Sequence, residues 1–71
     1  MKPTPYREVR RKLLKAGFYE ASQTGSHVKF AKTVESGLIT AVVPKHREVA
    51  TGTLRSILRQ AHLTESEFEK L

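Results

Sequence analysis

The stretch QTGSHVKFAK, residues 23–32, joins a turn to an alternating strand. Residues 24–26, Thr-Gly-Ser, are typical of a tight turn. Val28 and Phe30 then alternate with His27 and Lys29, as in a strand that buries one face. With Val28 and Phe30 in the core, His27 and Lys29 share the opposite, wetter face. The stretch therefore predicts a β-strand that begins with an exposed histidine.

Two more strands flank this one. Residues 18–23 are expected to form a short strand, but both of its faces carry apolar side chains, which leaves its inward side open. Ser36-Gly37 predicts a second turn. Leu38 to Val43 is apolar enough to be the central strand of a sheet, and Pro44 ends it because proline cannot donate to a strand ladder.

A helix precedes the strands. Thr4-Pro5 predicts its start, since threonine can cap free amides and proline suits the first helical position. An apolar stripe with helical spacing follows, and Gly17 predicts the end of the helix in a left-handed conformation. The stripe consists of Tyr6, Val9, Leu13 and Ala16.

A second and a third helix follow the strands. Leu54, Ile57, Leu58 and Ala61 have the spacing of an amphipathic helix. For its N-terminus we favour capping by Thr51 or Thr53 over phosphate binding. In the tail, Thr64 and Glu67 form a capping box, and Leu63 and Phe68 have the spacing of a hydrophobic staple, which predicts a short helix.

These elements predict an α+β fold with the order α-β-β-β-α and a short extra C-terminal helix. A three-stranded antiparallel sheet with the helices on one face is the simplest way to bury the apolar stripes. Residues 1–71 are expected to form a single domain, because no linker or internal repeat interrupts them.

Composition narrows the classes of function. The chain has 13 Lys and Arg against 7 acidic residues, a formal net charge of +6, and no cysteine. Disulfides, thiolate nucleophiles and cysteine zinc sites are thereby excluded. No apolar run approaches the roughly 20 residues of a membrane span, so we expect a cytoplasmic protein without a membrane partner. The charge favours a nucleic acid partner, although a solvated basic surface or an acidic partner protein would explain it equally well.

Few catalytic arrangements fit this composition. The chain has three histidines and no aspartate, and its glutamates are scattered between the main helices, so we expect no metal site and no Ser-His-Asp triad. RNA cleavage without a metal ion is compatible with this composition, because RNA supplies its own 2′-hydroxyl nucleophile. His27 can move a proton, Lys29 can hold a phosphate, and His46 between Lys45 and Arg47 is a candidate second participant. An ordinary surface histidine remains the alternative for His27.

Several short motifs, taken together, resemble the HicA family of small toxin ribonucleases, which prokaryotes encode beside an antitoxin. The resemblance runs from about Tyr6 to Leu63. The matching pieces, in the order and spacing of the family, are Gly17-Phe18, Gly25-Ser26-His27, Val43-Pro44-Lys45-His46, Gly52-Thr53-Leu54, Ile57-Leu58 and Gln60-Ala61.

The resemblance implies a fold like the double-stranded RNA-binding domain and metal-independent cleavage of mRNA. It makes His27 the catalytic residue and a HicB-type antitoxin the partner that covers the active face. We expect no small-molecule cofactor, and the residues expected to bind RNA are Ser26, Lys29, Lys45, His46 and Arg47. The alternatives are a non-catalytic RNA-binding module of the same fold and an interaction protein with an acidic partner.

Overall fold

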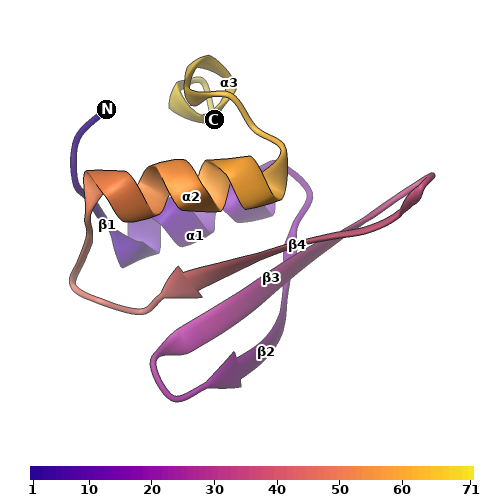
Figure 1. Ribbon diagram of the computed structural model, residues 1–71, viewed down its shortest axis with the longest axis horizontal. Coiled ribbons are helices and arrows are strands. Elements are labelled where there is room, and N and C mark those ends of the chain that lie inside the picture. Colours follow the sequence, from indigo (N-terminus) through magenta and orange to yellow (C-terminus); the bar gives the residue numbers. More distant parts are fainter.

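The computed structural model describes residues 1–71 and confirms the predicted α+β fold, which is consistent with the double-stranded RNA-binding-domain-like architecture (Figure 1). The elements in chain order are β1 (Thr4–Pro5), α1 (Tyr6–Lys15), β2 (Tyr19–Thr24), β3 (His27–Val34), β4 (Gly37–Pro44), β5 (Glu48–Val49), α2 (Thr51–Ala61) and α3 (Glu65–Glu69). None of the three helices combines the length and the apolar character needed to cross a bilayer.

The main sheet is antiparallel with the strand order β2-β3-β4, so the prediction of a central strand at Leu38 to Val43 is wrong. The central strand is β3, and β4 is an edge strand. The apolar content of β4 misled the prediction because Leu38 and Val42 lie on the exposed outer face, opposite the core residues Ala41 and Val43. Helix α2 packs along β4, where the Gln60 side chain accepts a hydrogen bond from the Val42 N–H at 3.1 Å.

Strand β2 contains a β-bulge, which explains why its inward side could not be assigned. The pairing with β3 runs from Tyr19 opposite Ala31 to Glu20 opposite Phe30, and then shifts to Ser22 opposite Lys29. Ala21 is the extra residue. Because a bulge absorbs one residue without a cross-strand partner, strict alternation fails across it.

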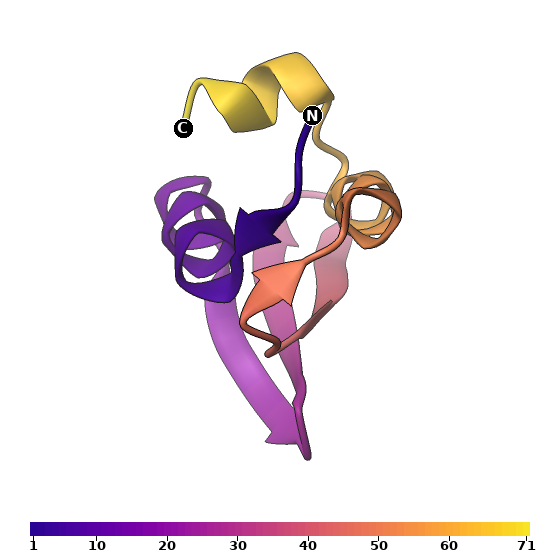
Figure 2. The ribbon, with the colours of Figure 1, turned by 90° about the vertical axis from the view of Figure 1, so that its left-hand side faces the viewer.

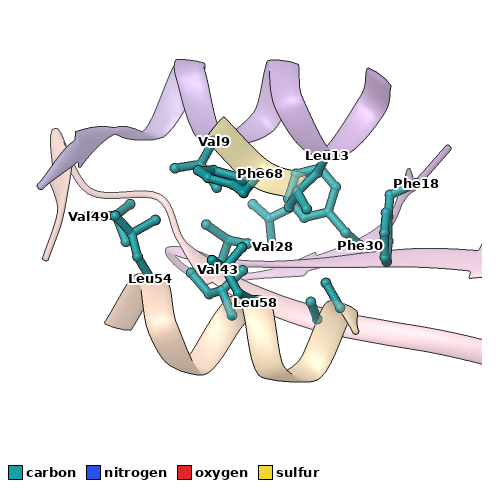
Figure 3. Packing of buried hydrophobic residues seen from close by; sticks show 13 residues of the cluster. Val9, Leu13, Phe18, Val28, Phe30, Val43, Val49, Leu54, Leu58 and Phe68 are labelled. Carbon is teal, nitrogen blue, oxygen red and sulfur yellow. The ribbon is translucent and has the colours of Figure 1, made fainter. Parts of the chain in front are cut away.

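Both long helices cover one face of the main sheet. Figure 2 shows α1 and α2 side by side above the strands, with α3 lying across them on the side away from the sheet. Val28, Phe30 and Val43 point between the helices, and Phe68 of α3 fills the space between α1 and α2 (Figure 3). No helix covers the other face of the sheet, which we call the outer face (Figures 1 and 2).

The ends of α1 differ in how well the sequence predicts them. Pro5 occupies the N-cap without a side-chain hydrogen bond, and the Thr4 hydroxyl donates to the Lys2 carbonyl at 2.9 Å, so the expected threonine cap is absent. Thr4 and Pro5 pair instead with Val49 and Glu48 as a two-stranded ribbon. The predicted stop is confirmed: Gly17 has φ +99° and follows the last turn of the helix.

The caps of the other helices are also mixed. Ala50 is the N-cap of α2 and neither Thr51 nor Thr53 caps it, because both threonines already lie inside the first turn. The apolar stripe of α2 is buried as expected. At α3 the capping box is confirmed, since the Thr64 hydroxyl accepts from the Glu67 N–H at 3.1 Å and the Thr64 N–H donates to the Glu67 carboxylate at 2.8 Å.

Candidate functional site

His27 is the first residue of the central strand, and its side chain is exposed on the outer face of the sheet. Its neighbour Val28 is 2% exposed and belongs to the core. This arrangement confirms the predicted alternation, in which one set of side chains stabilises the fold and the other set faces solvent. Across the sheet, His27 lies opposite Thr24 of β2 and Pro44 of β4. The imidazole is therefore flanked on both sides but open from the front.

The turn before His27 meets the segment that follows β4. The Lys45 N–H donates a hydrogen bond to the Ser26 carbonyl at 2.5 Å, which continues the β3–β4 pairing by one residue. Gly25 has φ +58°, a conformation that glycine adopts without the steric cost of a side chain. Two motifs that are far apart in the sequence, Gly25-Ser26-His27 and Pro44-Lys45-His46, therefore form one end of the sheet.

The segment after β4 is held at two further points. Val49 is buried in the core, and β5 pairs with β1, the short strand that directly precedes α1 in the chain. The Lys45 ammonium lies 5.9 Å from the centre of the Tyr6 ring, close enough for a cation–π contact. His46 and Arg47 are exposed between these anchors. The backbone of the segment is thus fixed while its side chains face solvent.

Tyr6 connects this segment to α1. Partial burial raises the pKa of the Tyr6 phenol, and the negative charge of Glu20 raises it further. The phenol therefore stays neutral at physiological pH. Tyr6 belongs to the predicted apolar stripe of the helix, whereas its contact with Lys45 was not predicted. No local sequence pattern predicts that contact, because it depends on the path of β4, which brings Lys45 next to α1.

Lys29 follows His27 on the same face, about 7 Å further along the strand. It lies opposite Ser22 and Val42 and is exposed. Of the cations on β3, the Lys29 ammonium is the nearest in sequence to the His27 imidazole. A phosphate bound beside His27 would therefore meet the Lys29 ammonium on the same face.

The outer face carries no carboxylate. Its residues, assigned from the strand register, are Tyr19, Ser22, Thr24, His27, Lys29, Ala31, Thr33, Leu38, Thr40, Val42 and Pro44. Glu20 lies opposite Phe30 and so belongs to the helix side, where it accepts a hydrogen bond from Arg10 of α1 at 2.6 Å. The face therefore carries one lysine, one histidine and several hydroxyl groups without an opposing negative charge, which suits a polyanion.

The site is an open surface rather than a pocket. The hollows of the molecule lie beside α3, around Lys2, Arg7 and Phe68 and next to Arg59, and His27 lines none of them. No three His, Asp or Glu side chains cluster as metal ligands do. An open face of this kind leaves room for a long polymer to cross it.

The structure brings together four of the six residues selected from the sequence. Ser26, His27 and Lys45 meet at the end of the sheet, and Lys29 follows on the same face. His46 and Arg47 lie in the adjoining segment and are exposed, but no hydrogen bond ties them to the histidine turn.

Comparison with models of known protein families gives a match. A family model described as "HicA toxin of bacterial toxin-antitoxin" matches residues 6–63, from the first residue of α1 to just past the end of α2. A comparison with curated proteins finds no match. The matched region contains the whole main sheet, His27 and the segment after β4.

Proposed function

This chain belongs to the HicA toxin family, and we propose that it cleaves mRNA by acid–base catalysis at His27, without a metal ion, until a HicB-type antitoxin covers that surface. Membership of the family makes the chain the toxin of a toxin-antitoxin module, and such toxins generally act as ribonucleases. The residue roles, the metal independence and the identity of the antitoxin are the proposal.

The observation that carries the proposal is the exposure of one imidazole at the end of a sheet face that has a lysine and no carboxylate. In metal-free cleavage the ribose 2′-hydroxyl loses a proton to a base, and its oxygen forms a new bond to the adjacent phosphorus. The bond from phosphorus to the 5′-oxygen then breaks, and an acid supplies the proton that the leaving oxygen takes up. Histidine suits either proton transfer because an imidazole changes charge near neutral pH.

The other residues bind the substrate in this proposal. Lys29 holds a phosphate oxygen on the same face as His27, and Lys45 and Arg47 extend the basic path along the segment after β4. Fixed cations of this kind stabilise the extra negative charge that develops on the phosphorane. The Ser26 hydroxyl and the His46 side chain supply further polar contacts to RNA. The HicB-type antitoxin neutralises the toxin by occupying the same face.

The test compares the protein with a His27→Ala variant on labelled mRNA in the presence of EDTA. We expect the unchanged protein to cleave and the variant to be slower by about 100- to 10,000-fold. A matched control is His62→Asn, because His62 is an exposed histidine at the end of α2 whose left-handed backbone asparagine tolerates. This control should cleave like the unchanged protein, and circular dichroism should show all three folded.

Each other outcome has a definite meaning. Equal cleavage by the His27→Ala variant would overturn the role of His27, and cleavage that EDTA abolishes would overturn the metal independence. RNA binding without cleavage by any form would favour a non-catalytic RNA-binding module. Copurification of the toxin with a HicB-type protein, and the loss of cleavage when that protein is added back, tests the partner.

A further inference from the structure

An exposed aromatic ring lies on the same sheet face as His27. Tyr19, at the start of β2, is 49% exposed. Its register partner is Ala31 of β3, which belongs to the outer face together with His27 and Lys29. The bulge at Ala21 keeps Tyr19 on this face, because Ser22 and Thr24 beyond it also pair with outer-face residues. Nothing in the cleavage chemistry at His27 requires this ring.

The ring stands at the end of a line of chemically distinct groups. Along β3 the outer face presents an imidazole at His27 and an ammonium at Lys29, and the covered residue Ala31 follows. Ala31 lies about 13 Å from His27, and Tyr19 lies beside it on the neighbouring strand β2. The imidazole, the ammonium and the aromatic ring therefore follow one another across the outer face, the first two on β3 and the third on β2.

The register partner of Tyr19 is a small, covered residue. Ala31 has no side-chain atom beyond its methyl group, and neighbouring side chains close over it, since it is 1% exposed. On the far side of Ala31, the β4 residue is Thr40, which is also short. A flat group can reach the Tyr19 ring from the solvent side, where about half of the residue is exposed.

The surroundings favour a nucleic acid as that flat group. The outer face has the Lys29 ammonium and several hydroxyl groups but no carboxylate, and the chain has a net charge of +6. Exposed aromatic rings beside cations bind unpaired nucleotides, since each base stacks on a ring while the phosphates meet the cations. Bases inside a duplex are already stacked and paired, so their faces are closed to such a ring.

We infer that Tyr19 stacks on a base of the RNA, and that the RNA is therefore single-stranded between the scissile phosphate at His27 and the nucleotide at Tyr19. This inference rests on the proposed cleavage at His27 and adds the substrate class and a binding residue to it. Lys29 lies between the two points and holds an intervening phosphate.

The first test measures RNA affinity in a His27→Ala background, where the substrate stays intact. Binding of a short unstructured RNA to Tyr19→Leu and Tyr19→Phe is followed by fluorescence anisotropy. Leucine keeps apolar area but removes the aromatic face, so we expect its affinity to fall by about 5- to 100-fold. Phenylalanine keeps the face and should bind within about twofold. The same RNA annealed to its complement should bind both variants equally.

The second test locates the stacked base. In an RNA with one cleavage site, each nucleotide near that site is replaced in turn by an abasic residue. One abasic position should weaken binding to the protein with Tyr19 and have no further effect on Tyr19→Leu, because the variant has already lost that contact. The other positions should weaken binding to both forms equally.

The outcomes separate this inference from the proposal beneath it. If the protein with His27 cleaves RNA, but Tyr19→Leu binds RNA unchanged and no abasic position couples to Tyr19, the stacking inference is overturned and the cleavage proposal stands. If Tyr19→Leu loses only its complex with the antitoxin, the ring belongs to a protein interface and the inference is likewise overturned. Absence of cleavage with Tyr19-dependent, single-strand-specific binding would overturn the catalytic role of His27 alone.

Discussion

The two faces of β3 carry out different tasks with alternate residues of one strand. On the helix side Val28 and Phe30 are 2% and 0% exposed and form the centre of the hydrophobic core. On the outer face His27 and Lys29 are exposed and touch no part of that core. Adjacent residues of this strand can therefore belong either to the core or to the candidate site, because successive side chains point in opposite directions.

The separation has a practical consequence for the outer face. Substitutions there leave the core intact, so loss of function can be distinguished from loss of fold. A domain of 71 residues has little stability to spare, which makes the core side correspondingly sensitive. Neighbouring residues on β3 therefore provide matched pairs of variants.

The largest effect on stability is expected for Phe30→Ala. The ring is fully buried, so its removal leaves a cavity and should lower the free energy of unfolding by about 3–5 kcal/mol. Urea denaturation followed by circular dichroism measures this change. The neighbouring variant Lys29→Ala is the control and should unfold within about 0.5 kcal/mol of the unchanged protein. Equal denaturation midpoints for the two variants would show that the core and solvent faces of the strand are assigned the wrong way round.

A smaller and different effect is expected for Lys29→Ala in RNA binding. Loss of one phosphate contact should weaken binding and reduce the slope of log affinity against log salt concentration by about 0.7 for a single strand. Titrations at several salt concentrations, with His27 replaced by alanine to keep the RNA intact, give this slope. An unchanged slope would remove Lys29 from the phosphate path and weaken the contrast between the two faces.

The smallest effect is expected at α3, which belongs to neither face. Hydrogen bonding to Thr64 lowers the pKa of the Glu67 carboxylate from 4.5. The charged form is thus favoured in the folded state, and its contribution to stability is present above that value and lost as the pH falls through the lowered pKa. In Glu67→Gln, which keeps a capping-box side chain, the melting temperature should fall slightly less on acidification below pH 4.5. RNA cleavage by this variant at neutral pH should be unchanged, and a loss of cleavage would contradict the assignment of the site to the sheet face.

The difference between the two faces of β3 was largely predictable from the sequence, because Val28 and Phe30 alternate with polar residues through an uninterrupted strand. The order of helices and strands, the stop at Gly17 and the capping box at Thr64 were predictable for the same reason: each is encoded by residues near one another in the chain. Local patterns carry this information without knowledge of tertiary contacts.

Tertiary contacts explain what the sequence did not reveal. The central position of β3 follows from the two tight turns that join it to β2 and β4, and the apolar content of β4 was the wrong guide to which strand lies at the edge. The ribbon of β1 and β5 has only two residues in each strand, too few to produce an alternating pattern. At the site, the hydrogen bond from Lys45 to Ser26 joins two backbone groups, so no side-chain motif encodes it.

The bulge at Ala21 determines where this domain tolerates a change in length. Because Ala21 has no partner on β3, a deletion of its codon would leave every other pair of β2 and β3 in place, and Tyr19 would stay on the outer face. Residues 28–33 all have cross-strand partners, so a deletion among them would exchange core and surface side chains along the rest of the central strand. Evolution can thus shorten the edge strand by one residue and keep the surface, whereas the central strand has a fixed length.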